Sequence, residues 1–187
     1  MTIQEPIDRD KKLNIIAIAD ESEYGTATVR YGLKLAEIFR ASLTIITKFG
    51  FTMEEPKGLN LSDSRVHDIE HLLDSTVETS ILTEYFFPEL LYNYAEKRNT
   101  MMFVIGVEKD GKNAFFSTRK AIRFIKPSRL PVMTVGLSCP SDDVFKHVIL
   151  PLDIERQAKE KALWAGYFSR FHQSTIHLLY PNYRDSG

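Results

Sequence analysis

The chain lacks several features that would place it outside the cell or in a membrane. It has a single cysteine, Cys139, so an intrachain disulfide framework is excluded and a reducing compartment is favoured. No apolar run approaches the roughly 20 residues that span a bilayer. Residues 1–12 are polar and charged, without the apolar core of a signal peptide. We therefore predict a cytoplasmic protein with no membrane segment.

One-sided charge and catalytic motifs are also missing. The net charge is −1, so no global field draws the chain to nucleic acid. Neither a phosphate-binding Walker sequence nor a nucleophile-elbow sequence occurs. His67 and His71 have metal-ligand spacing on a predicted helix, but no third ligand is evident, and a solvated helix face is the simpler interpretation. We predict no catalytic residues, no metal site and no required cofactor.

Apolar runs and helical patterns alternate along the first two thirds of the chain. Such runs are typical of strands that helices cover on both sides. The sequence predicts strands at residues 13–19, 43–47, 76–82, 101–106 and 130–135, and helices at residues 23–39, 62–74, 84–98 and 114–126. This order predicts an α/β fold, an open doubly wound five-stranded parallel sheet with helices on both faces.

In such sheets, ligands bind beyond the carboxyl ends of the strands. Asp20 and Thr47 end two of the predicted strands, and residues 106–113 form the loop after a third. Ser117 and Thr118 stand in the first turns of the helix predicted after that loop. Helix N-termini favour anions, so this edge of the sheet is the candidate site.

The tail repeats the opening of the chain. Asp153 ends an apolar run 133 positions after Asp20, and at this offset residues 15, 16, 35, 38, 43, 45 and 46 match residues of the same type in the tail. Self-similarity of this kind indicates duplication. We predict a first domain at residues 1–137, a linker at 138–145, and the β-α-β start of a second copy at 146–187.

Taken together, these segments resemble the universal stress protein family in its tandem form, with the second domain incomplete. The resemblance rests on residues 15–20, 41–47, 94–106 and 121–135, and on their order and spacing. It implies an adenine nucleotide alpha hydrolase-like fold. It also implies dimerisation through the last strand and, for some members, binding of ATP or AMP.

The nucleotide-binding members carry Gly-x2-Gly-x9-Gly-Ser/Thr after the fourth strand. Here Gly106 matches the first glycine, Lys109 replaces the second, Gly111 lies two residues further on, and Ser117 and Thr118 stand where the family has Gly-Ser. Lysine and arginine side chains near this loop can supply phosphate contacts instead. The candidate nucleotide-binding residues are Ala19, Asp20, Thr47, Gly106, Lys109, Gly111, Ser117 and Thr118, with ATP or AMP (and Mg²⁺) as the ligand.

Each of these residues also has a purely structural interpretation. Asp20 can cap the helix that follows it, and the two glycines can simply permit a tight turn. The lysines can form a solvated face. Ser117 and Thr118 can stabilise the first turn of their helix.

The sequence therefore predicts a non-catalytic module in stress response or signalling, in which a nucleotide orders residues 107–113 and biases partner contacts. The predicted dimer edge is Val132, Met133, Thr134 and Val135, in a homodimer or an intramolecular pseudo-dimer. Two alternatives remain. One is a regulatory interaction domain without nucleotide, its crevice filled by side chains such as Phe115 and Phe116. The other is a weak metal-dependent nucleotide hydrolase in which Asp20 holds the metal ion.

Overall fold

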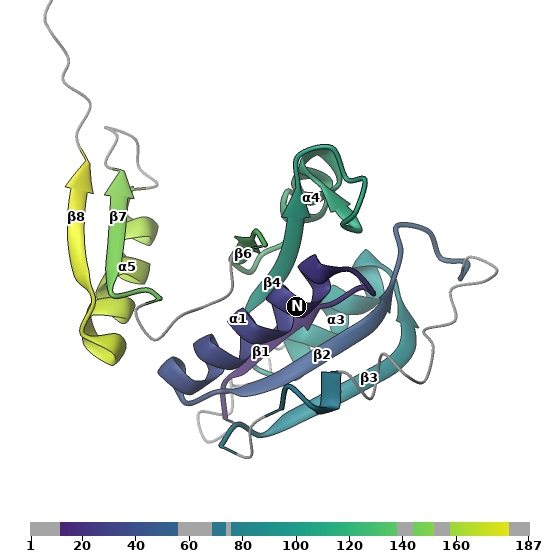
Figure 1. The fold of residues 1–187 in the computed structure, drawn as a ribbon, viewed down its shortest axis with the longest axis horizontal. Helices are drawn as coiled ribbons and strands as arrows, with labels where there is room; N and C mark the ends of the chain where they lie inside the picture. The colour runs from purple at the N-terminus through teal and green to yellow at the C-terminus, as the bar shows by residue number, and fades with distance from the viewer. Residues whose placement is uncertain (1–11, 56–68, 74–75, 138–143, 152–157, 180–187) are drawn as a thin grey trace, which may run out of the picture. The chain divides into compact units, whose positions relative to one another are not determined.

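The computed structural model describes residues 12–55, 69–73, 76–137, 144–151 and 158–179 (Figure 1). The chain divides into two compact units, residues 1–139 and 140–187. Most of the predicted helix at residues 62–74, and Cys139, His67 and Asp153, lie outside the described residues. Among the helices of the described part, none has the length and apolar content needed to cross a membrane.

The first unit is built on a parallel sheet. Its strands are β1 (Asn14–Ile18), β2 (Ser42–Phe49), β3 (Thr79–Phe86), β4 (Thr100–Glu108), β5 (Phe116–Ser117) and β6 (Val132–Val135). The long strands lie in the order β3-β2-β1-β4-β6, and the short β5 pairs with the end of β4. Every strand pair of the described residues is parallel. The predicted fold class is confirmed.

Helices cover both faces of this sheet. Gly32 of α1 (Glu23–Phe39) lies so close to Ala17 and Leu43 that an added Cβ would be 3.0 Å from the Leu43 side chain. Ile16, Ile18 and Ile46 point to the opposite face, because strand side chains alternate. There they form one core cluster with residues of α3 (Pro88–Lys97) and α4 (Thr118–Ile125). Figure 1 shows α1 running across one side of the sheet and α3 behind it.

Three predicted boundaries are wrong, and local contacts explain why. The third strand extends to Phe86, because Tyr85 and Phe86 continue the ladder with Lys48 and Phe49 of β2. The helix that was predicted from residue 84 therefore begins at Pro88, a residue suited to a first helical position. The helix that was predicted from residue 114 begins at Thr118, after the two residues of β5.

The second unit contains one β-α-β crossover. Its elements are β7 (His147–Pro151), α5 (Ala158–His172) and β8 (Thr175–Leu179). The register of β7 with β8 reproduces that of β1 with β2 at the 133-residue offset: Val148 pairs with Ile176 as Ile15 pairs with Leu43.

Backbone details repeat at the same offset. Arg40 and Gln173 both have left-handed backbone conformations, with φ of 52° and 56°. The amide of Ser42 donates to the Leu13 carbonyl at 2.8 Å, and that of Thr175 to the Lys146 carbonyl at 2.7 Å. The two units therefore share strand register, backbone conformation and hydrogen bonds at equivalent positions, as well as the pattern of apolar residues.

Candidate functional site

Asp20 lies at the carboxyl end of β1, and the chain itself engages both of its carboxylate oxygens. Oδ1 accepts a hydrogen bond from the Ser22 amide at 2.9 Å and another from the Ser22 hydroxyl. Oδ2 accepts one from the backbone amide of Phe115 at 2.5 Å. Ser22 in turn caps α1 by accepting from the Gly25 amide at 3.2 Å. Asp20 thus joins the start of α1 to a segment 95 residues further along the chain.

The segment that Asp20 holds brings two phenylalanines to this edge of the sheet. Phe116 is only 2% exposed and stacks on Phe49, with ring centroids 5.7 Å apart. Phe115 is half-buried and lies nearly parallel to Phe51, with centroids 6.0 Å apart and planes inclined by 9°. The aromatic rings therefore fill space beside the carboxyl ends of β2 and β4.

Two predicted site glycines, Gly106 and Gly111, have structural roles. The strand predicted to end at residue 106 extends to Glu108, so Gly106 lies inside β4 and only Gly111 lies in the loop after it. A Cβ at Gly106 would lie 2.7 Å from the Tyr24 carbonyl oxygen and 2.8 Å from Thr28 Oγ1, so this glycine lets α1 pack against β4. Gly111 has φ of +64°, where side chains are disfavoured, and a Cβ there would meet the Ser117 side chain at 2.6 Å. In this arrangement their missing side chains make room for protein atoms.

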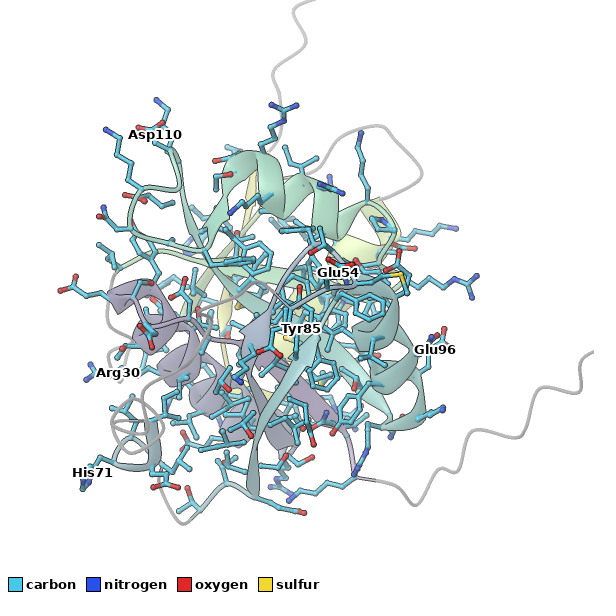
Figure 2. The ribbon with its side chains drawn as sticks, turned by 90° about the vertical axis from the view of Figure 1, so that its right-hand side faces the viewer. Arg30, Glu54, His71, Tyr85, Glu96 and Asp110 are labelled. Atoms are coloured by element: carbon cyan, nitrogen blue, oxygen red, sulfur yellow. The ribbon has the colours of Figure 1, made fainter. Side chains whose placement is uncertain are left out.

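Glu108 closes the same loop. Its carboxylate accepts hydrogen bonds from the Asn113 backbone amide at 2.7 Å and from Asn113 Nδ2 at 2.9 Å. The hydrogen bond that the Asn113 backbone amide donates is the main reason that the pKa of Glu108 lies below its usual value of 4.5. Figure 2 shows Asp110 at the tip of this loop, pointing away from the sheet.

Acidification is expected to open this loop. Because the folded-state pKa of Glu108 is lowered, its contribution is complete above pH 4.5 and is lost as pH falls through the lowered pKa. The protection factor of the Asn113 amide, which is its intrinsic exchange rate at each pH divided by the rate observed by NMR, should fall in that acidic range. In Glu108→Gln the protection factor should be lower at neutral pH and should no longer fall on acidification. An unchanged profile in the variant would contradict the role of Glu108.

The start of α4 carries the predicted hydroxyls. Ser117 Oγ accepts from the Lys120 amide at 3.3 Å as the helix N-cap, and Thr118 Oγ1 donates to the Lys109 carbonyl at 3.4 Å. The Lys120 ammonium donates to the Phe115 carbonyl at 3.1 Å and lies 4.6 Å from the centre of the Phe115 ring. The Lys109 side chain is exposed. These residues stabilise the same closed segment.

Ala19 and Thr47 complete the predicted set, and both are buried. The Ala19 amide donates to the Ile46 carbonyl at 2.9 Å, and Thr47 Oγ1 donates to the Leu82 carbonyl at 3.0 Å. These bonds join the carboxyl halves of β1, β2 and β3. The predicted residues after β1 and β4 thus meet around Asp20, whereas Thr47 faces the β3 side.

The structure adds participants that the sequence did not single out. The Phe115 amide is invisible to a motif search, because every residue but proline has one. The sequence indicates only a polar loop around Glu108. An acidic residue five positions before an asparagine could have suggested a hydrogen bond between the two ends of this loop. No group of three or more histidine, cysteine, aspartate or glutamate side chains in the described ranges could hold a metal ion.

Asp20 and Gly106, which the family resemblance predicts to bind an adenine nucleotide, both contact other parts of the chain. The carboxylate oxygens of Asp20 accept hydrogen bonds from two backbone amides, and the side of Gly106 that lacks a side chain contacts α1.

Comparison with known proteins identifies the fold. No protein-family model matches the chain, and no curated protein matches it. A universal stress protein from Archaeoglobus fulgidus DSM 4304 superimposes with a TM-score of 0.66, over 92% of this chain and 68% of that one, at 10% identity. A universal stress protein in complex with cAMP matches 68% of this chain and 99% of its own at 15% identity, with a TM-score of 0.47. The Archaeoglobus fulgidus universal stress protein in complex with dAMP matches 66% of this chain and 96% of its own at 12% identity, with a TM-score of 0.39. The chain has the fold of universal stress proteins.

Proposed function

We propose that this chain is a cytoplasmic, non-catalytic universal stress protein-like module of stress response or signalling. It works through contacts with other proteins, and its crevice is closed by its own residues. The hydrogen bond from the Phe115 amide to Asp20, with the burial of Phe116 beside it, carries this proposal. The residue pattern after β4 supports it too, because Lys109 stands where nucleotide-binding members have glycine.

The closed segment is held at several independent points, so opening it requires more than the loss of one bond. Asp20 binds the Phe115 amide, Glu108 binds Asn113, and Phe116 is packed among core aromatics. A ligand that entered here would have to replace these contacts. A ligand can shift such an equilibrium only by its differential affinity for the open state.

A metal-dependent hydrolase is the less favoured alternative. Both oxygens of Asp20 accept hydrogen bonds from the chain, so a metal ion would have to displace Ser22 or Phe115. A hydrolase predicts Mg²⁺-dependent release of phosphate from ATP that disappears in Asp20→Ala. Turnover at the same rate in this variant would count against the hydrolase.

Adenine nucleotide binding is the second candidate function. The start of α4 favours it, because Ser117, Thr118, Arg119 and Lys120 gather hydroxyl and cationic groups at a helix N-terminus. In this candidate ATP or AMP binds the open form, through the eight residues that the family resemblance assigns. Mg²⁺ would accompany the phosphates of ATP.

Calorimetry with ATP and AMP, each with and without Mg²⁺, separates the two candidates. The interaction module predicts no heat of binding at millimolar nucleotide. A sharper comparison uses Phe115→Pro, which removes the amide donor to Asp20, against Phe115→Ala, which removes the ring but keeps the donor. Stoichiometric heat in the native chain would overturn the closed-crevice proposal. Binding heat in Phe115→Pro alone would show that the hydrogen bond from the Phe115 amide to Asp20 excludes the nucleotide.

The proposed partner surface includes the edge strand β6. Val132 to Val135 pair with β4 on one side, and no second pairing of β6 occurs among the described residues. The Phe103 amide donates to the Pro131 carbonyl, so alternation along the ladder turns the amides of Val132 and Thr134 away from β4. We propose that this edge forms a homodimer or the interface of an intramolecular pseudo-dimer.

Thr134→Pro tests the dimer edge. Proline removes an outward amide and is tolerated on edge strands, so the fold should remain while edge pairing is lost. Sedimentation velocity should show a dimer for the native chain and a monomer for the variant, with unchanged circular dichroism. Thr134→Ser is the matched control, since it keeps the backbone amide at this position. Equal association of native chain and Thr134→Pro would contradict the proposed edge.

A further inference from the structure

The repeat places a polar pair at the same point of each unit. In the first unit, Thr44 Oγ1 donates to Asn14 Oδ1 across the diagonal between β1 and β2, at 3.1 Å. The residues 133 positions later are His147 and His177. Their ring nitrogens, Nδ1 of His147 and Nε2 of His177, lie 3.0 Å apart. The second unit has thus replaced an oxygen pair with a nitrogen pair in the same geometry.

This histidine pair lies on the sheet face away from α5. Leu150 is 8% exposed and Ile149 is 68% exposed, so α5 covers the face that carries Leu150. His147 alternates with Val148 and therefore shares its face with Ile149, which pairs with His177. Both imidazoles are exposed. The pair is open to solutes.

The equivalent point in the first unit is hollow even though helices cover that face. Asn14, Ser42, Thr44 and Ser80 line a cavity of about 530 Å³ near the amino ends of β1, β2 and β3. The cavity offers hydroxyl and amide oxygens, whereas the second unit offers two imidazole nitrogens at the matching positions. The first unit therefore serves as an internal reference that has no imidazole at the two matching positions, Asn14 and Thr44.

We propose that His147 and His177 together bind a divalent transition-metal ion, with Ni²⁺ and Cu²⁺ preferred. Two nitrogens 3.0 Å apart, each about 2.0–2.1 Å from a metal, subtend an angle of about 94° at that metal. This is close to the right angle between neighbouring ligands in square-planar or octahedral sites, and smaller than the tetrahedral angle that Zn²⁺ adopts. Water completes the coordination, since the described residues supply no third side chain.

Metal binding requires a change of tautomer and a rotation of the rings, because the two nitrogens that now face each other must turn toward a shared metal ion. In the metal-free chain, one of the two facing nitrogens donates its proton to the other in an N–H···N hydrogen bond. When the metal binds, both facing nitrogens present lone pairs. The proton of the former donor moves through water to the outer nitrogen of the same ring. The exposed outer nitrogens are solvated in either state.

Titration of the untagged full chain with NiCl₂ or CuCl₂ tests this site. Calorimetry should give one metal per chain, and NMR should show paramagnetic broadening of the His147 and His177 ring signals first. The matched variant is the double replacement His147→Asn with His177→Thr, which installs the residues of the first unit. It should bind each metal at least about tenfold more weakly, because both nitrogen ligands are gone.

His71→Ala serves as the control, since it removes an imidazole of the first unit and should leave the metal affinity unchanged. Circular dichroism checks that the double variant folds; if it does not, His177→Thr alone supplies the same comparison. Equal affinity of the native chain and the variant, broadening centred on other residues, or no binding at millimolar metal would each overturn the proposal.

Discussion

Replacing Phe124 with alanine is expected to lower the free energy of unfolding by about 3–5 kcal/mol, the usual cost of deleting a buried phenylalanine. Phe124 is fully buried, and its ring contacts those of Phe49, Phe103 and Phe116 at centroid distances of 5.6, 5.4 and 5.7 Å. It ties α4 to the sheet and to the closed segment at once. Urea denaturation followed by circular dichroism measures the effect.

Ile122→Ala is the matched control for Phe124→Ala. Ile122 lies on the same helix but is 50% exposed, so its replacement should change the free energy of unfolding by less than about 1 kcal/mol. A similar loss in both variants would mean that the aromatic cluster is not the core of the first unit. A loss below 1 kcal/mol in Phe124→Ala would mean the same.

Replacing Asp20 with alanine is expected to lower the free energy of unfolding by about 2–3 kcal/mol. Hydrogen bonds to a charged acceptor are among the stronger ones, and the Phe115 amide loses its partner. The variant should also speed hydrogen exchange at Phe115, as the segment beyond β4 separates from β1. Thermal or urea unfolding gives the first quantity, and NMR-detected exchange gives the second.

Two further variants interpret the Asp20→Ala result. Asp20→Asn keeps one acceptor oxygen and should fall between the native chain and the alanine variant. Asp110→Ala removes a carboxylate from the loop tip, where Figure 2 shows it pointing outward, and should be close to neutral. If Asp20→Ala is no more destabilising than Asp110→Ala, Asp20 does not hold the segment that closes the crevice.

The sheet could be predicted because its strands are buried on both faces. Residues such as Ile15, Ile16 and Val104 are fully buried, and this burial leaves the long apolar runs that mark parallel strands. The repeat could be predicted for a related reason: paired strands with the same register need apolar residues at the same spacing. Thus Val148 opposite Ile176 matches Ile15 opposite Leu43.

The contacts that hold Phe115 and Phe116 beside Asp20 could not be predicted from the sequence. Phe115 fits an apolar helical face by spacing, but the structure places it before the helix, where Ser117 is the N-cap. What holds it there is a backbone amide that bonds to Asp20, and a backbone donor leaves no trace in residue type. The interaction-domain alternative, with a crevice filled by Phe115 and Phe116, stays a prediction; the structure shows Phe116 buried and Phe115 half-buried at this edge of the sheet. The eight residues that the resemblance predicts for nucleotide binding remain a prediction; in the structure, Asp20, Gly106 and Ser117 contact other parts of the chain.

The hydrogen bond between Asp20 and the Phe115 amide is the point on which the proposed function depends. Native mass spectrometry of the freshly purified chain, followed by analysis of small molecules released on denaturation, tests it most directly. We expect the mass of the bare polypeptide and no released adenine nucleotide. A stoichiometric complex with AMP or ATP, lost in Asp20→Ala, would show that the crevice is open in the cell and would contradict the closed module.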